Sequence, residues 1–166
     1  TDDSRDVVFG DLFLAYPGDT SDGRDYITDA IAKGAAAVFW DPDHYQWQKD
    51  VKIPNYPVAG LKKLVSSLAA THYDHPSAKL SVIGVTGTNG KTTVTQWMTA
   101  AIEILGKKSA VIGTLGIGRP SAIKPSKLTT PNPVTLQREM VRFVKDGIAY
   151  VAMEVSSIGI EEGRVS

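Results

Sequence analysis

The chain has 166 residues, 42% of them hydrophobic, which suffices for one ordinary domain, or for one small domain and part of a second. Its 18 basic and 18 acidic residues balance, so the charge gives no reason to expect nucleic acid as a partner. It contains no cysteine, which excludes a disulfide scaffold and a thiolate metal site but not a carboxylate-held Mg²⁺. No apolar run is long enough for a membrane span, and residues 1–6 do not resemble a secretion signal, so we expect a cytoplasmic protein.

Residues 1–78 predict a small α/β domain with a β-loop-α-β beginning. Its expected elements are a strand at 7–16, a turn-rich loop at 17–23, a helix at 25–33, a strand at 35–40, an edge strand at 55–59 and a helix at 61–73. The strand at 55–59 is placed at a sheet edge because Pro57 has no N–H to donate, and proline is tolerated in an edge strand.

Residues 79–166 predict part of a second α/β domain, built on a parallel sheet. Its expected elements are strands at 81–85, 109–113 and 148–153, a helix at 93–105 and a helix from about 133. Between them, 114–127 is rich in Gly, Pro, Ser and Lys and predicts a mobile excursion. The first helix has apolar residues at helical spacing, for which we expect core packing: Val94, Trp97, Met98, Ala101, Ile102 and Leu105.

The stretch from Ser81 to Thr93 has the form of a phosphate-binding loop, with a β-branched strand, a glycine-rich turn and a helix start. Lys91 would supply a mobile cation for the terminal phosphates, and Thr92 a hydroxyl for Mg²⁺. The spacing departs from the general pattern G-x-x-x-x-G-K-[ST], because Val85 stands six places before Lys91 and Gly84 comes one place too early. The loop is therefore of an unusual subtype.

Glu154 ends an apolar strand and is followed by Val155-Ser156-Ser157. An acid at this position is typical of the carboxylate that helps to hold Mg²⁺ in phosphate-loop enzymes. The alternative role, an acid that caps the following turn, is less favoured because of the phosphate loop upstream. Ligands of parallel sheets bind beyond the carboxyl ends of the strands, so we expect 86–92, Thr114 and 154–157 to converge.

The loop at 84–93 resembles that of the Mur ligases, which reads G-T-N-G-K-[TS] and shares the unusual spacing. These are ATP-dependent, amide-forming enzymes of peptidoglycan precursor synthesis. Residues 3–27 resemble the family's UDP-substrate domain, and 128–131 resemble its substrate-binding threonine pair. Residues 153–157, with Arg164, resemble the strand end of the member that adds the third peptide residue.

The resemblance implies a small N-terminal α/β domain, 1–78, that binds the UDP end of the substrate, and a partial P-loop-type ATPase domain, 79–166. It implies ATP and Mg²⁺ as cofactors, with Lys91 and Glu154 as the catalytic residues. The residues implied to bind ATP are Thr88, Asn89, Gly90, Lys91, Thr92 and Thr93. Those implied for Mg²⁺ are Thr92 and Glu154. Those implied for the UDP-muramoyl peptide are Ser4, Thr20, Ser21, Thr129, Thr130, Ser156 and Arg164. Ile158 and Glu162 stand where many relatives have His and Gln, which places those two contacts in question.

The implied reaction joins an amino acid to UDP-N-acetylmuramoyl-L-Ala-D-Glu. The substrate carboxylate attacks the γ-phosphate of ATP to give an acyl phosphate, which an amino group then attacks. The sequence alone does not select the amino acid that is added. The resemblance to the family implies meso-diaminopimelate. We expect a monomer that lacks the second-metal lysine and the amino-acid-binding domain, and is therefore an incomplete chain without ligase activity of its own.

Three other interpretations stay open. The chain could be another ligase of the superfamily, either another muramoyl ligase or a folylpolyglutamate synthase. It could be a non-catalytic nucleotide-binding module, although the Asn-Lys-x-Asp motif that selects guanine is missing. It could also be an α/β fragment whose loop binds only adventitious phosphate.

Overall fold

Three short parallel strands form the N-terminal sheet of this computed structural model, which describes residues 1–19, 21–126 and 128–165. The strand order is β1 (Leu12–Ala15), β2 (Ala37–Trp40), β3 (Asn55–Pro57). The short helices η2 (Gly23–Tyr26) and α1 (Ile27–Ala32) connect β1 to β2, as a parallel pair requires, and η1 (Ser4–Asp6) precedes β1. The predicted edge strand is confirmed, because β3 pairs with β2 alone and so tolerates Pro57.

The core of this sheet is formed by alternate residues of the strands together with the apolar side of α1. Phe13 and Val38 are fully buried between them. The other buried members of this cluster are Val7, Ala15, Ile27, Ala30, Ala35 and Trp40. Fully burying a side chain such as Phe13 contributes about 1.5–3 kcal/mol, so these few contacts carry much of the stability of a small unit.

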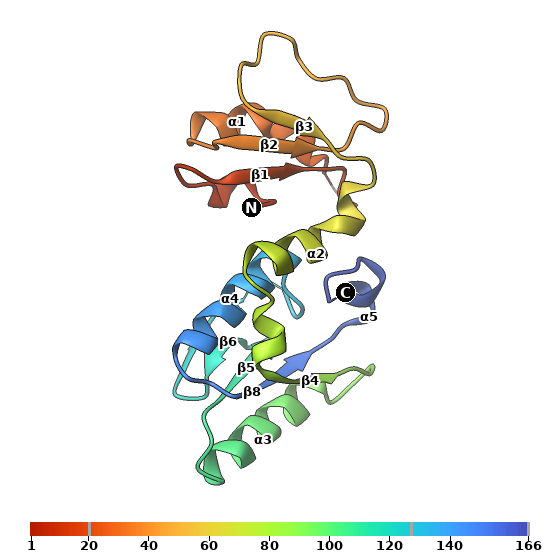
Figure 1. Cartoon of the computed structure of the whole chain (residues 1–166). Helices are drawn as coiled ribbons and strands as arrows, with labels where there is room; N and C mark the ends of the chain where they lie inside the picture. Colours follow the sequence, from red (N-terminus) through yellow and green to blue (C-terminus); the bar gives the residue numbers. More distant parts are fainter. Residues whose placement is uncertain (20, 127, 166) are drawn as a thin grey trace. The chain divides into compact units, whose positions relative to one another are not determined.

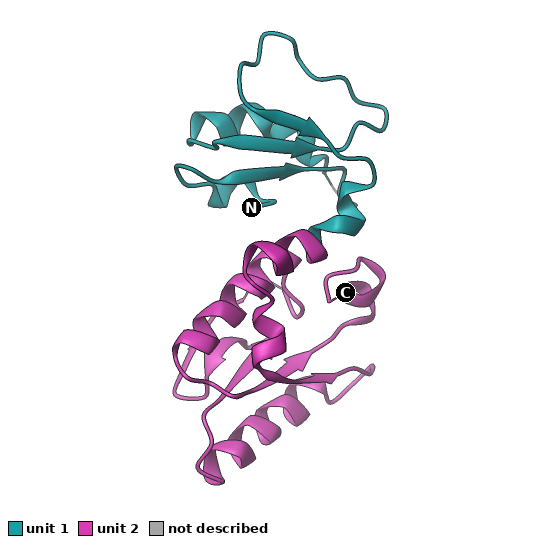
Figure 2. Ribbon diagram, in the orientation of Figure 1, with its two compact units in different colours: residues 1–65 teal, residues 66–166 magenta. Residues whose placement is uncertain are grey.

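The chain forms two compact units, 1–65 and 66–166, which divide within helix α2 (Leu61–His72) (Figure 2). Leu61 and Val65 are buried near the beginning of α2, and Ala69 is buried in its second half. The 3-10 helix η3 (Pro76–Lys79) then leads into the second sheet. The functional division at 78/79 stays a prediction.

The second unit has a five-stranded sheet in the order β4 (Ser81–Val85), β8 (Tyr150–Glu154), β5 (Ser109–Gly113), β6 (Gly116–Arg119), β7 (Ala122–Lys124). The first three strands are parallel, with Val85 opposite Glu154 and Ile112 opposite Met153. The carboxyl ends of β4, β8 and β5 therefore meet at one edge of the sheet (Figure 1). The predicted convergence of the loop, Glu154 and Thr114 follows from this register.

Two helices cover the sheet of the second unit. Helix α4 (Pro133–Lys145) packs Leu136, Met140 and Phe143 against one face, on residues that alternate along the strands: Ala110, Ile112, Val151 and Met153. Helix α3 (Lys91–Ile104) lies on β8 and β5 and buries Thr95 and Thr99 completely. These hydroxyls donate to carbonyl groups within α3 itself, so small, self-satisfied side chains allow close packing on the strands.

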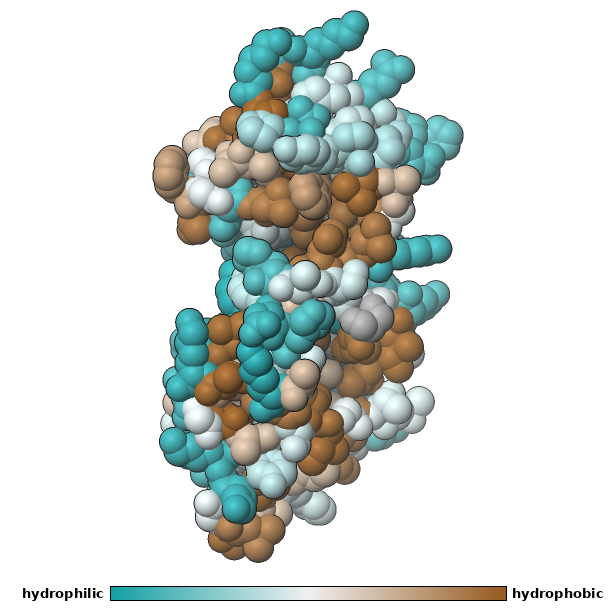
Figure 3. Space-filling model, viewed as in Figure 1, coloured by the Kyte–Doolittle hydropathy of each residue, from teal (hydrophilic) through white to brown (hydrophobic). Residues whose placement is uncertain are grey.

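The predicted core role of the apolar residues at 94–105 is wrong for Val94, Trp97, Ala101 and Leu105, which are exposed, whereas Met98 and Ile102 are partly buried. Trp97 is 72% exposed and Leu105 76% exposed, and Val94 and Ile104 are exposed as well. The hydrophobic surface at the end of α3 is visible in brown at the bottom of Figure 3. The apolar periodicity correctly located the helix. The side of α3 that faces the sheet, however, is the one that carries Thr95 and Thr99, next to the apolar row.

The predicted mobile excursion at 114–127 is also wrong where the structure describes it. Strands β6 and β7 form an antiparallel hairpin that extends the sheet beyond β5, so the sheet is mixed. Gly116 and Gly118 have φ of +134° and +145°, and any Cβ at these positions would clash with the backbone of β7. The glycines that suggested a loop are instead the residues that allow two strands to approach closely. No helix of the described residues is long and apolar enough to cross a membrane.

Replacing Gly116 with Ala tests this hairpin. An alanine Cβ would lie 2.1 Å from the carbonyl oxygen of Lys124, in addition to the strain of a positive φ. We expect the free energy of unfolding to fall by about 2 kcal/mol or more, measured by urea denaturation. The matched control is Gly106→Ala, which has a φ of +73° but open space around the new Cβ, and which should cost about 1 kcal/mol. Equal losses in the two variants would contradict the packing of the hairpin.

Candidate functional site

The loop between β4 and α3 ends on Gly90, which has a φ of +83° and occupies the N-cap of the helix. Gly90 offers no side chain to cap the helix, and the first helical hydrogen bond runs from the N–H of Val94 to the carbonyl of Gly90. The preceding N–H groups of the first turn therefore remain available at the positive end of the helix dipole. Such an end binds phosphate. The neighbouring Thr88, Asn89 and Thr93 are exposed.

The ammonium group of Lys91 lies over this loop. Its Nζ donates to the carbonyl oxygen of Gly87 at 2.6 Å. The side chain has no carboxylate partner among the ion pairs of the described residues, so its charge is available to an anion. A flexible ammonium that touches the loop backbone can move to a phosphate bound in the same loop.

Glu154 is the most completely buried acid of the site, with 1% of its surface exposed. Its Oε2 accepts the hydroxyl of Thr92 at 3.0 Å and that of Thr114 at 3.2 Å. Its Oε1 accepts the backbone N–H of Thr114 at 2.9 Å. These donors are all neutral, so the described residues leave the buried negative charge of Glu154 without a cation. A bound cation would compensate that charge.

Thr92 and Glu154, the predicted metal pair, thus lie in direct contact. Carboxylate and hydroxyl oxygens are the hard ligands that Mg²⁺ prefers, and Mg²⁺ commonly binds to one or two protein groups together with phosphate and water. The described residues form no cluster of three or more His, Cys, Asp and Glu side chains, which fits an ion shared with a phosphate ligand better than a closed protein cage.

Gly113 makes room for the carboxylate of Glu154 on the neighbouring strand. A Cβ at Gly113 would lie 2.2 Å from Oε1 of Glu154. Sequence reasoning did not find this role, because it arises from the parallel pairing of β5 with β8. The available signal was only that Gly113 immediately precedes Thr114 at the end of a strand.

A turn built on Thr130 adjoins Glu154. The buried Thr130 hydroxyl donates to the backbone carbonyl of Glu154 at 3.0 Å and accepts the N–H of Ser156 at 3.0 Å. The hydroxyl of Ser156 accepts the N–H of Gly159 at 3.0 Å and so caps helix α5 (Ser157–Glu161). Arg164 donates to the carbonyl of Thr130 at 2.7 Å.

The structure thereby places the four predicted substrate residues of the second unit in one network with Glu154. Thr129 completes the set, because its hydroxyl lies 3.0 Å from that of Thr114. The two positions that depart from the relatives behave differently. Glu162 pairs with Arg164, whereas Ile158 is exposed.

The predicted UDP contacts lie in the first unit. Ser4 is buried in η1, and its carbonyl accepts the ammonium of Lys33 at 2.9 Å. Ser21 is exposed and its carbonyl accepts the N–H of Gly18 at 2.9 Å. Thr20, the third residue of this prediction, lies outside the described residues.

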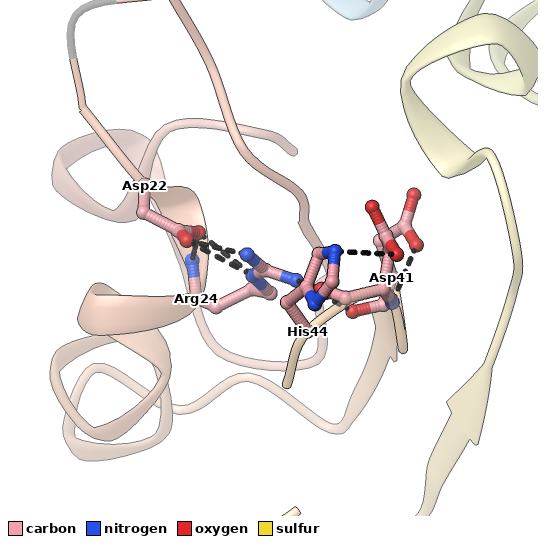
Figure 4. Close-up of polar contacts among 5 residues, drawn as sticks. Asp22, Arg24, Asp41 and His44 are labelled. Atoms are coloured by element: carbon pink, nitrogen blue, oxygen red, sulfur yellow. Dashed lines mark hydrogen bonds and ion pairs between the residues drawn. The ribbon is translucent and has the colours of Figure 1, made fainter. Parts of the chain in front are cut away.

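Arg24 organises the end of the 17–23 loop, which sequence reasoning did not assign to any single residue (Figure 4). Its guanidinium forms a bidentate pair with Asp22 and donates to the carbonyls of Asp41 at 3.0 Å and Asp43 at 2.5 Å. The Asp41 carboxylate in turn accepts the N–H of Leu61, at the beginning of α2. Arg24 hydrogen bonding holds the pKa of Asp22 below its ordinary value.

Two protein-family models match the chain. Residues 1–73 match a family model described as "Mur ligase family, catalytic domain". Residues 85–166 match the model "Mur ligase middle domain", which covers the phosphate loop, Thr114 and Glu154. The chain belongs to the Mur ligase family. The resemblance seen in the loop spacing is confirmed.

The Mur ligases similar to this chain include curated relatives of one name, UDP-N-acetylmuramoyl-L-alanyl-D-glutamate--2,6-diaminopimelate ligase. The protein from Neisseria meningitidis serogroup A is 46% identical over 99% of this chain and 34% of its own length. The Nitrosomonas europaea protein is 46% identical over 98% of this chain and 31% of its own length. The chain thus spans about a third of these relatives.

Solved Mur ligase structures share the fold. A structure of UDP-N-acetylmuramoyl-L-alanyl-D-glutamate--2,6-diaminopimelate ligase has a TM-score of 0.78 at 27% identity, covering 99% of this chain and 33% of that one. The Thermotoga maritima MurF ligase in complex with ADP has a TM-score of 0.59 at 22% identity, over 95% of this chain and 31% of that one, and supports the fold alone. The predicted α/β fold class is confirmed, and the individual residue roles stay predictions.

Gly113→Ala tests the space reserved for the carboxylate. The new methyl group must displace Glu154, so we expect a loss of about 1–3 kcal/mol in the free energy of unfolding by urea denaturation. Gly84→Ala is the control, because its Cβ would lie 3.3 Å from a methyl group of Val155, which can move aside. A Gly113→Ala variant as stable as the Gly84→Ala variant would show that the site is looser than described.

Asp22→Asn tests the ion pair with Arg24 through its pH dependence. Because the pKa of Asp22 is lower in the folded than in the unfolded state, its carboxylate stabilises the folded state at pH values above the unfolded pKa of about 3.9. This stabilisation is lost as the pH falls through the pKa of Asp22 in the folded state. We expect the variant to be about 1–2 kcal/mol less stable than the wild type near neutral pH, with the difference shrinking below about pH 4. Asp50→Asn, a carboxylate for which the described residues show no ion pair, should be nearly neutral throughout. A difference that grows on acidification would contradict the assignment.

Proposed function

We propose that this chain supplies the ATP site and the UDP-muramoyl peptide site of a ligase that adds meso-diaminopimelate to UDP-N-acetylmuramoyl-L-Ala-D-Glu. One observation carries the proposal: the phosphate loop and the substrate turn both reach Glu154. The hydroxyl of Thr92 donates to its carboxylate, Thr130 donates to its backbone carbonyl, and Thr129 is linked to the carboxylate through Thr114. A phosphoryl donor and an acceptor must lie side by side to react. The names of the relatives at 44–46% identity support the choice of substrate and amino acid.

In the proposed reaction, the substrate carboxylate attacks the γ-phosphate of ATP, and an amino group then displaces phosphate from the acyl phosphate. Phosphoryl transfer depends mainly on positioning and charge stabilisation. The first-turn N–H groups of α3 and the ammonium of Lys91 would bind the phosphates, with Thr88, Asn89 and Thr93 around them. Thr92 and Glu154 would hold Mg²⁺, which would reduce the repulsion between the two anionic reactants.

The substrate turn would orient the acceptor. Thr130 fixes the chain after β8 through its bond to the carbonyl of Glu154, and so sets the positions of Ser156 and Arg164. Arg164 donates to the carbonyl of Thr130 in this turn, and its guanidinium also pairs with Glu162. In the first unit, Ser4 and Ser21 would contact the UDP end, together with Thr20. The cytoplasmic location and the monomeric state stay predictions.

Calorimetric titration tests the proposal, with UDP-N-acetylmuramoyl-L-Ala-D-Glu in one experiment and a non-hydrolysable ATP analogue plus Mg²⁺ in another. We expect measurable binding of both. Binding of the nucleotide without the muramoyl peptide would favour another ligase of the superfamily, such as a folylpolyglutamate synthase. Binding of neither ligand would leave only adventitious phosphate as an occupant of the loop.

Lys91→Ala tests the phosphate loop in the same assay. Loss of a charge-assisted contact should weaken binding of the ATP analogue by roughly 10- to 100-fold, while leaving the muramoyl peptide affinity nearly unchanged. Lys107→Ala removes the same charge from an exposed position after α3 and serves as the control. Equal nucleotide affinities for the two variants would remove Lys91 from the site.

A further inference from the structure

Three side chains form a continuous row of hydrogen bonds at the edge of the sheet. The hydroxyl of Thr129 lies 3.0 Å from that of Thr114, and the hydroxyl of Thr114 lies 3.2 Å from Oε2 of Glu154. The row runs from the substrate turn, through the end of β5, to the proposed metal carboxylate. Thr114 had no assigned role in the sequence-based prediction beyond its place at the strand end.

The chemistry of these groups fixes the direction of each bond. An ionised carboxylate accepts hydrogen bonds and has no proton to donate. A hydroxyl has one proton and two lone pairs, so the hydroxyl of Thr114 donates its only proton to the carboxylate of Glu154. In the hydrogen bond between Thr114 and Thr129, the donor must then be Thr129, whose hydroxyl donates to the hydroxyl oxygen of Thr114. The hydroxyl of Thr92 donates its proton to Oε2 of Glu154. Thr92 therefore has no proton left to donate to Thr114.

We propose that this row orients Thr129 as a hydrogen-bond acceptor toward the muramoyl peptide, so that Thr129 meets an N–H or O–H group of the substrate and not its carboxylate. Because it names the substrate, this assignment rests on the proposed function. The carboxylate would then be left to the donors of the same turn, of which Arg164 carries a positive charge. Thr114 is a positioning residue, since it acts through Thr129 and Glu154.

The orientation depends on the charge of residue 154. In a Glu154→Gln variant, the amide oxygen can still accept the N–H of Thr114, and the amide nitrogen can donate to the hydroxyl of Thr114. The proton of Thr114 would then be free to turn to Thr129, whose own proton would point outward. The Glu154→Gln substitution should therefore change the Thr129 hydroxyl from a hydrogen-bond acceptor toward the substrate into a donor.

Neutron diffraction from deuterium-exchanged crystals of the whole chain, without any ligand, tests the orientation directly. We expect the deuteron of Thr129 on the line to Thr114 and the deuteron of Thr114 on the line to Glu154. In Glu154→Gln both should be reversed. A wild-type Thr129 deuteron that points away from Thr114 would overturn the inference, whatever the chain binds.

A double-mutant cycle measured by calorimetry with UDP-N-acetylmuramoyl-L-Ala-D-Glu tests the consequence for binding. Thr129→Val should weaken binding by about 3- to 10-fold, as expected for one neutral hydrogen bond, and Thr129→Ser should restore it. Thr114→Val should weaken binding when Thr129 is present but have no further effect in the Thr129→Val background, because it acts through that residue. Thr114→Ser should match the wild type.

Effects of the two valine substitutions that simply multiply would overturn the coupling. If the wild-type chain binds no muramoyl peptide at all, the proposed function fails, and the neutron result alone decides the orientation. Circular dichroism melting curves of the four valine and serine variants identify any variant that has lost its fold.

Discussion

The buried carboxylate of Glu154 joins three segments that are distant in the sequence. It accepts hydrogen bonds from Thr92 at the beginning of α3 and from both the N–H and the hydroxyl of Thr114 after β5, while its own backbone carbonyl binds Thr130. Burying a charge is costly unless it is paired and hydrogen-bonded. Here the hydrogen bonds are present but come from neutral groups, so the site is organised in advance and still suited to a cation.

Much of this site could be predicted from the sequence, because parallel strands bring their carboxyl ends to one edge. Once β4, β5 and β8 were recognised, the meeting of Thr92 and Glu154 followed. Its finer structure could not be predicted. The roles of Gly113 and Thr114 depend on the pairing of β5 beside β8, and no local pattern shows which neighbouring strand will supply the room and the donors for a carboxylate.

The two incorrect predictions have a common cause, since in both a local signal was interpreted without the tertiary contact that decides it. Trp97 lies in a clear helical pattern, yet the close approach of α3 to the sheet selects Thr95 and Thr99 for the buried side. Gly116 suggested a loop, yet it sits where β7 comes too close for a Cβ. In the first unit, the Asp22-Gly23-Arg24 stretch was noticed only as a resemblance, because the carbonyl partners of Arg24 lie 17 and 19 residues further along.

We infer that Thr92, Thr114 and Glu154 surround one metal–nucleotide site. Mn²⁺ can replace Mg²⁺ as a paramagnetic probe, and the amide NMR signals of the labelled chain can be followed with a non-hydrolysable ATP analogue present. We expect Mn²⁺ to broaden the signals of Thr92, Thr114 and Val155 most strongly, and only when the analogue is present. The Glu154→Gln substitution should remove this effect. Nucleotide-dependent broadening centred elsewhere in the chain, or unchanged in Glu154→Gln, would contradict this inference.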